Sequence, residues 1–217
     1  MRQHDIFITS NHLRRRDLVI TILNFSRRVG GINDAICADL ERGLVAKGLH
    51  SRIIHARDLT IGFCNNCRNC MKVPGEELGE CHLNDDMKGL LETILNSRCL
   101  IVSAPVNCYD LPSLVRVMLE RMSVFCYWPD DKYSPAVRKM PREIRGVLIT
   151  TSALPGIMVP LVTRARKSFR LFARPLRITK VDYHHLGFKG RKSDMIYTDK
   201  DRRVVRNIVE KLATFLA

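Results

Sequence analysis

Leu18-Val-Ile-Thr-Ile-Leu-Asn-Phe25 is the stretch of sequence that decides the fold. Its apolar residues face both sides of an extended chain, as in a central strand of a parallel sheet that is covered on both faces. A polar, glycine-bearing loop follows at 26–33. After the loop, apolar residues recur every four residues from Ile36 to Leu44, which predicts a helix with one apolar face.

The alternation of strand and helix patterns continues along the chain. The patterns predict further strands at 51–59, 99–103, 146–151 and 178–186. They also predict a helix after residues 84–86, a helix that begins at Pro112, a helix at about 157–173 and a last helix at 204–215. Alternation without internal repeats implies a parallel sheet with helices on both faces. We therefore predict one α/β domain at 18–217, a doubly wound five-stranded parallel sheet, preceded by a basic N-terminal extension at 1–17.

The composition is that of a basic globular protein. The 217 residues are 46% hydrophobic and carry a formal net charge of +14, but the lysines and arginines are spread along the chain. We interpret most of this charge as a solvated surface, with steering of anionic cofactors as the alternative, and nucleic acid is not expected as a partner. The sequence has neither a membrane-length apolar run nor the apolar core of a signal peptide. We expect a cytoplasmic protein with no membrane partner.

Three loops follow buried strands, where ligands of doubly wound sheets bind. In the loop 26–33, backbone N–H groups, glycines, a hydroxyl and an arginine suit a phosphate dianion, and the alternative is a polar turn with a helix cap. The loop 105–111 exposes backbone amides and Tyr109, which suit a flat heteroaromatic ring. The loop 151–156 offers hydroxyls and a flexible backbone.

The three loops resemble those of the NADPH-dependent FMN reductase branch of the flavodoxin superfamily, over roughly 18–216. The first loop of that family reads Gly-Ser-Pro-Arg and then Gly-Asn-Thr. Matching residues here are Ser26, Arg28, Gly31 and Asn33. The resemblance implies a flavodoxin-like fold in which these four residues bind the phosphate of FMN.

The first loop departs from the family pattern at three positions. Phe25, Arg27 and Asp34 replace the usual Gly, Pro and Thr. A carboxylate at Asp34 is unfavourable beside a phosphate unless it points away or caps the helix.

The second loop follows the family outline of Ser-Pro-Val-Tyr, a proline, and later Lys and Asp-Arg. Arg116 and Glu120-Arg121 stand at the later positions. Asn107 occupies the position of the family's Tyr, and Tyr109 follows two residues later. The resemblance implies flavin contacts from the second and third loops at Pro105, Val106, Asn107, Cys108, Tyr109, Thr151, Ser152 and Gly156.

Four of the eight cysteines, Cys64, Cys67, Cys70 and Cys81, lie within eighteen residues and precede Asp85-Asp-Met87. A similar pattern occurs in the family, and in its iron–sulfur flavoprotein subgroup a compact version ligates a [4Fe–4S] cluster. The ten-residue spacer before Cys81 is longer than the gap in that subgroup. Four thiolates can hold a cubane cluster or a tetrahedral zinc, and other members keep such cysteines without a cluster. A cluster, zinc and reduced free thiols are therefore three open alternatives, whereas a disulfide scaffold is not expected.

The resemblance implies an FMN-dependent oxidoreductase that takes hydride from NAD(P)H and passes electrons to a small acceptor, such as a quinone, flavin, azo or nitro compound. Because the flavin carries the chemistry, we nominate no catalytic side chain. The alternative is an electron carrier with FMN and a [4Fe–4S] cluster on 64–81. A more distant alternative is a non-enzymatic regulator that uses the basic surface.

The connection 125–143 breaks the strand–helix pattern, because it contains three prolines and several aromatic residues, among them Trp128. Apolar surface of this kind commonly marks an interface, and related reductases form dimers or tetramers. We therefore expect a homodimer or homotetramer with Trp128 near the interface. The alternative is that Trp128 covers the core of its own chain.

Overall fold

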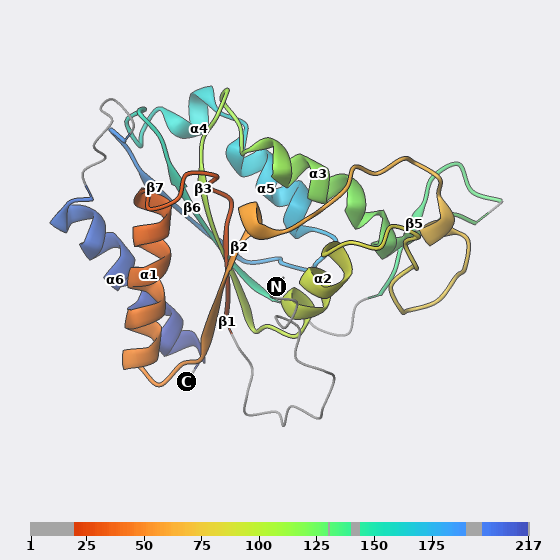
Figure 1. Ribbon diagram of the computed structural model, residues 1–217, viewed down its shortest axis with the longest axis horizontal. Helices are drawn as coiled ribbons and strands as arrows, with labels where there is room; N and C mark the ends of the chain where they lie inside the picture. The colour runs from red at the N-terminus through yellow and green to blue at the C-terminus, as the bar shows by residue number, and fades with distance from the viewer. Residues whose placement is uncertain (1–19, 130, 140–143, 190–196, 217) are drawn as a thin grey trace, which may run out of the picture.

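The computed structural model describes residues 20–129, 131–139, 144–189 and 197–216. A central five-stranded sheet is covered by helices on both faces (Figure 1). The basic extension expected at 1–17 lies outside the described residues.

The sheet has the order β2-β1-β3-β6-β7, and all neighbouring strands are parallel. Its strands are β1 (Ile20–Asn24), β2 (Ser51–His55), β3 (Cys99–Pro105), β6 (Arg145–Thr151) and β7 (Val181–Leu186). β1 pairs with β2 on one side and with β3 on the other, and all five of its residues are buried, as its apolar run predicts. The flavodoxin-like doubly wound fold is thereby confirmed, and the strand order reverses between β1 and β3.

Two helical layers enclose two separate cores (Figure 1). One layer consists of α1 (Ile32–Ala46) and α6 (Asp199–Leu216), and the other contains α2 (Met87–Leu95), α3 (Ser113–Arg121) and α5 (Ala165–Ala173). Ile20 and Ile22 of β1 enter the first core, while Leu23 enters the second, because successive side chains of a strand point to opposite faces. None of the helices in the described ranges combines the length and the apolar composition that crossing a bilayer requires.

The second strand is shorter than the expected range 51–59. It ends at His55 and continues as a short 3-10 helix, η1 (Ala56–Asp58). At this point the side chain of Arg57 turns toward the N-terminal end of α1, where Nη1 is 2.8 Å from Oδ1 of Asp34. Arg57, expected inside the strand, therefore lies just beyond the end of the sheet.

The single basic helix expected at about 157–173 is wrong, because the structure has two helices there. A short helix α4 (Val159–Val162) is followed by an extended Thr163, with φ −120° and ψ 155°, before α5 begins. The backbone N–H of Arg164 donates to the carbonyl oxygen of Tyr109 at 2.8 Å. This contact with a distant loop replaces a helical hydrogen bond and separates the two helices.

The segment of the four clustered cysteines packs against the aromatic connection and forms a lobe beside the sheet. We call residues 60–86, 122–129 and 131–139 the cysteine lobe. Its regular elements are η2 (Asn69–Met71), η3 (Met122–Phe125), and an antiparallel pair of β4 (Cys126–Tyr127) and β5 (Ala136–Val137).

Arg138 holds the cysteine lobe together from inside. It is only 5% exposed, and its guanidinium donates to four backbone carbonyl oxygens, those of Val124 (3.2 Å), Gly75 (3.0 Å), Cys70 (3.1 Å) and Val73 (2.8 Å). A guanidinium has only donors, so four converging carbonyl groups satisfy it. One side chain thus joins the two segments of the lobe.

Trp128 packs within the same lobe. Its backbone N–H donates to Met71 O at 2.9 Å, and the guanidinium of Arg68 lies 4.6 Å from the centre of its ring. The indole Nε1–H donates to Lys132 O at 2.9 Å. Trp128 therefore contacts its own chain, and its place at a subunit interface stays a prediction.

Candidate functional site

The N-terminus of α1 lies at the point where the strand order reverses. Gly31 is the N-cap residue and supplies no side-chain cap. Within the described part of the chain, the backbone N–H groups of Ile32 and Asn33 have no acceptor. Open N–H groups and the positive end of the helix dipole together form a site for an anion.

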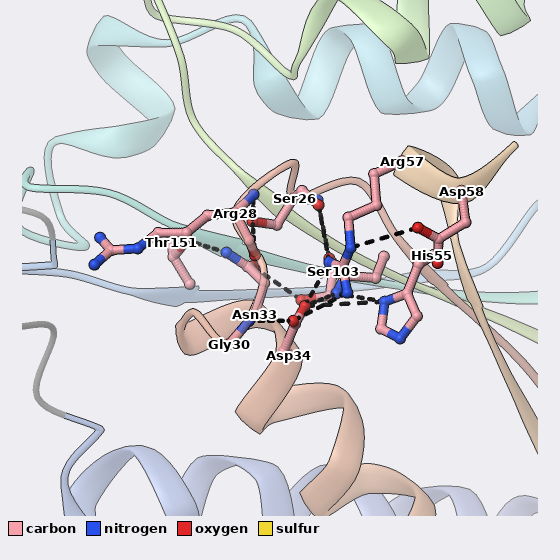
Figure 2. Close-up of polar contacts among 11 residues, drawn as sticks. Ser26, Arg28, Gly30, Asn33, Asp34, His55, Arg57, Asp58, Ser103 and Thr151 are labelled. Atoms are coloured by element: carbon pink, nitrogen blue, oxygen red, sulfur yellow. Dashed lines mark hydrogen bonds and ion pairs between the residues drawn. The ribbon is translucent and has the colours of Figure 1, made fainter.

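Asn33 connects the three predicted loops (Figure 2). Its Nδ2 donates to Oγ1 of Thr151 at 3.1 Å, and its Oδ1 accepts from Oγ of Ser103 at 2.9 Å. All three residues are buried. Next to them, the N–H of Val106 donates to the carbonyl oxygen of Thr151 at 2.8 Å. The structure therefore brings the ends of β1, β3 and β6 together, with the Asn33 amide in the protein interior.

Asp34 points toward β2, away from Thr151 (Figure 2). Its two carboxylate oxygens accept from Nη1 and Nη2 of Arg57 at 2.8 and 3.1 Å. The same carboxylate also accepts from Nδ2 of Asn24 at 2.6 Å and from the backbone N–H of Gly30 at 2.8 Å. Burial alone would raise the pKa of Asp34, but these hydrogen bonds and the charge of Arg57 hold it below its ordinary value.

Arg57 is therefore a residue of this site that the sequence analysis missed. Its side chain is 12% exposed, and it also donates to the carbonyl oxygen of Ser26 at 3.2 Å. In the sequence, Arg57 is visible only as a charged residue within the range 51–59 that is expected to form a strand. Because the pair is 23 residues apart along the chain, no local pattern reveals it.

Ser26, Arg28 and Gly31 form the body of the first loop. The N–H of Ser26 donates to Oδ1 of Asn24 at 2.9 Å, and the N–H of Arg28 donates to Oγ of Ser26 at 3.3 Å. A Cβ added at Gly31 would lie 3.3 Å from the Arg28 side chain, which passes closely beside it. Figure 2 shows the Arg28 guanidinium extending away from Arg57, on the side of Thr151.

The second loop is a tight turn with unusual backbone angles. The backbone N–H groups of Asn107 and Asp110 donate to each other's carbonyl oxygens at 2.8 and 2.9 Å. The two residues between them, Cys108 and Tyr109, have φ of 47° and 64°. Non-glycine residues in this region cost roughly 1–3 kcal/mol each and cluster at functional sites. The turn follows Pro105 and presents the Tyr109 side chain, 65% exposed, at its tip.

The third loop is held by His185 of β7. Nδ1 of His185 lies 2.8 Å from Oγ1 of Thr150, and Nε2 lies 3.2 Å from Oγ of Ser152. A Cβ at Gly156 would lie 3.8 Å from the same imidazole. Burial lowers the pKa of His185, so the ring is neutral at pH 7. The sequence analysis found Ser152 and Gly156 but missed the histidine, because β7 is remote in sequence.

The four clustered cysteines line one small cavity in the cysteine lobe, separate from the three loops. Among the described residues, no three or more histidine, cysteine, aspartate or glutamate side chains are placed to hold a metal ion. The buried Arg121 lies beside Cys81, with Nη2 3.6 Å from Sγ, and pairs with Asp85 at 2.5 Å. The Asp-Asp-Met and Arg positions of the family pattern thus fix the lobe to α3.

Solved structures with the same fold include several reductases and oxidoreductases. A flavone reductase aligns with a TM-score of 0.64 and 14% identity, covering 91% of this chain and 62% of its own. An NAD(P)H:quinone oxidoreductase from Methanothermobacter marburgensis aligns with a TM-score of 0.65 and 14% identity, covering 93% and 100%. An NADH:FMN oxidoreductase in its apo form aligns with a TM-score of 0.57 and 12% identity, covering 92% and 90%. At this identity the likeness establishes the fold.

The sequence itself supplies the family. No curated protein matches the chain. The family model described as NADPH-dependent FMN reductase matches residues 18–153, a range that includes the first two loops and the beginning of the third. The chain therefore belongs to the NADPH-dependent FMN reductase family, and it is an NAD(P)H-dependent flavin oxidoreductase.

Proposed function

We propose that the protein binds FMN across the three loops and passes electrons from NAD(P)H to a small organic acceptor, with quinones as the first class to test. The meeting of the three loops at the open N-terminus of α1 carries this proposal. A quinone is chosen because a structural neighbour that this chain covers completely is an NAD(P)H:quinone oxidoreductase.

The first loop fits a phosphate group. The N–H groups of Ile32 and Asn33, which have no acceptor among the described residues, supply donors, as does the exposed Arg28. Arg28 and the helix dipole supply positive charge. The carboxylate of Asp34 does not oppose this assignment, because Arg57 neutralises it and it points toward β2. Gly31 completes the fit, since its missing side chain leaves room beside Arg28.

The second and third loops fit the flavin ring. The turn at 107–110 presents Tyr109 and the nearby backbone of Pro105 and Val106, and the third loop faces it across the end of β6. We assign Asn33 a positioning role, since its amide joins Ser103 to Thr151 and so fixes the distance between the loops.

Bound FMN supplies the chemistry of accepting hydride and releasing electrons. The residues of this chain would hold its phosphate at the first loop and contact its ring at the second and third loops. None of them is required as a nucleophile or general base. The electron-carrier alternative gains no support from the arrangement of the four cysteines.

The experiment is a steady-state assay of NADPH and NADH oxidation with FMN and a panel of acceptors, including a benzoquinone, free flavin, an azo dye and a nitroarene. We expect turnover that requires FMN and is fastest with the quinone. Turnover that is unaffected by removal of FMN would refute the flavin assignment. A quinone rate no higher than the rate with oxygen alone would refute the acceptor class.

A further inference from the structure

Exposed apolar side chains follow the third loop and continue onto α4. Ile157 is 81% exposed and Leu161 is 82% exposed, whereas Val159 between them is buried. The other exposed apolar side chains of this segment are those of Met158 and Val162. Apolar surface that gathers in one place in this way commonly marks a site for a partner or a membrane.

Phe188 extends the same surface from the other side of the third loop. It follows β7, is 67% exposed and has a φ of 58°, a value that few non-glycine residues adopt. The backbone on both sides of Phe188 is packed against the third loop. A Cβ at Gly187 would lie 2.6 Å from the carbonyl oxygen of Leu154, and the N–H of Lys189 donates to the carbonyl oxygen of Ser152 at 2.7 Å. We call the five exposed residues the apolar strip: Ile157, Met158, Leu161, Val162 and Phe188.

Basic residues follow the apolar strip along the chain. Between Glu143 and Asp182 the sequence contains no acidic residue. The basic residues on α5 and at its two ends are all exposed: Arg164, Arg166, Lys167, Arg170 and Arg174. No carboxylate of the described residues forms an ion pair with any of these five. The positive charge of this surface is therefore not compensated locally.

The apolar strip and the basic residues meet at the second and third loops. The backbone N–H of Arg164 donates to the carbonyl oxygen of Tyr109, the exposed residue at the tip of the second loop. Arg166 is within electrostatic reach of His185, which holds the third loop, since its charge lowers the pKa of that histidine further. Figure 1 shows α4 next to the start of α5 at this end of the sheet. One end of the molecule thus carries both exposed apolar side chains and positive charge.

This combination fits the surface of a membrane better than other partners. At a membrane, apolar side chains enter the boundary of the acyl chains, while lysines and arginines attract anionic headgroups. Nucleic acid would account for the charge but not for the exposed aliphatic side chains. A second copy bound through the same patch would bring the basic residues of both copies together, because a two-fold interface pairs a patch with itself.

We propose that the apolar strip and the basic residues of α5 bind the surface of a membrane that contains anionic phospholipid. Ile157 and Leu161 enter the boundary of the acyl chains, and Lys167 and Arg174 contact lipid phosphates. The sequence analysis expected no membrane partner because no apolar run is long enough to cross a bilayer, but binding at the surface needs no such run. Lipid binding also needs no flavin, so the failure of this proposal or of the proposed function leaves the other intact.

The first test is flotation of the full-length protein, saturated with FMN, with two kinds of vesicle. One kind is phosphatidylcholine with about one quarter phosphatidylserine, and the other is phosphatidylcholine alone, to which we expect at least about tenfold weaker binding. Ile157→Ser with Leu161→Ser should weaken binding to the anionic vesicles about tenfold. Val45→Ser, at an exposed position of α1 in the other helical layer, should leave it unchanged. No binding, or equal binding to both kinds of vesicle, would overturn the proposal.

The second test separates this surface from the net charge of the protein. Lys167→Gln with Arg174→Gln should weaken binding to the anionic vesicles at least about tenfold. Arg203→Gln with Arg206→Gln removes the same charge from exposed positions of α6 and should have little effect. Circular dichroism checks that each variant is folded. Equal losses in the two double variants would show that binding follows net charge alone and would overturn the assignment.

The same variants distinguish the other occupants. Light scattering compares the unaltered protein with the double variant Ile157→Ser and Leu161→Ser. A dimer that dissociates in the double variant would assign the apolar strip to a second copy and overturn the membrane proposal. A DNA oligonucleotide that binds as tightly as the anionic vesicles, and equally well to the double variant, would assign the basic residues to nucleic acid and overturn it as well.

Discussion

At the scale of the residue, Asn33 links two strand ends in the candidate site. One buried amide joins Ser103 of β3 to Thr151 of β6 and stands in the first turn of α1. A buried hydroxyl that loses its partner costs about 1–3 kcal/mol. The family pattern identified Asn33 in the sequence as a residue of the phosphate site, and the structure adds its link between the ends of two strands.

We predict that Asn33→Ala lowers the free energy of unfolding by about 1–3 kcal/mol and weakens FMN binding at the same time, because the loops lose their common anchor. Urea unfolding and FMN titration measure the two effects. Asn96→Ala, an exposed asparagine at the end of α2, is the matched control and should change neither. Wild-type stability in Asn33→Ala would contradict this role.

Arg57 gives a second prediction at the same scale. Without it, the Asp34 carboxylate would stand unneutralised in the first turn of α1, next to the proposed phosphate site. We expect Arg57→Gln to weaken FMN binding about tenfold, or about 1.4 kcal/mol. The double variant Asp34→Asn with Arg57→Gln should recover much of that loss, because the repelling charge is gone. If the double variant binds as weakly as Arg57→Gln alone, charge compensation is not the function of the pair.

At the scale of the element, the local sequence pattern predicted the strands. It failed where contacts between residues far apart in the sequence determine the structure. β1, β3 and β6 are buried on both faces, so their apolar runs identify them. The division of 157–173 into α4 and α5 depends on the hydrogen bond from Arg164 to Tyr109, two residues far apart in sequence. The sequence analysis missed His185 and Arg57 for the same reason, because each contacts a loop that lies elsewhere in the chain.

The cysteine lobe gives a prediction about an element rather than a single bond. Arg138→Ala removes every hydrogen bond from its guanidinium to the lobe carbonyls, and we expect the lobe to lose at least about 2 kcal/mol of local stability. Limited proteolysis within 72–78 should become faster, while the protection of β1 and β3 in hydrogen exchange is unchanged. Arg116→Ala, which removes an exposed pair with Glu120, should have little effect. Uniform loss of protection across the sheet would show that the lobe is not a separate unit.

At the scale of the whole molecule, three paired carboxylates make stability depend on pH. Burial raises the pKa of Asp34, Asp85 and Asp201, but hydrogen bonds from Arg57, Arg121 and Lys189 outweigh burial and hold each pKa below the ordinary value of 3.8. A carboxyl whose pKa is depressed by folding stabilises the protein fully above its unfolded pKa. That contribution is lost as the pH falls through the folded-state pKa.

We therefore predict that these groups change the free energy of unfolding little between pH 7 and about pH 5. Below about pH 4, the free energy of unfolding should decrease as the pH falls. Urea unfolding at each pH measures it. Asp34→Asn should flatten the decline, because that carboxyl no longer takes up a proton on unfolding. The same change at the exposed Asp131 should leave the slope as it was. A slope in Asp34→Asn equal to that of the unaltered protein would contradict the assignment.

The central claim, that the open N-terminus of α1 holds the phosphate of FMN, is tested most directly by comparing FMN with riboflavin, which lacks the phosphate. Fluorescence titration should show FMN binding at least about 100-fold more tightly. Arg28→Gln should weaken FMN roughly tenfold or more and leave riboflavin unchanged. Lys47→Gln, at the opposite end of the same helix, should alter neither. Equal affinity of the unaltered protein for FMN and riboflavin would contradict the account.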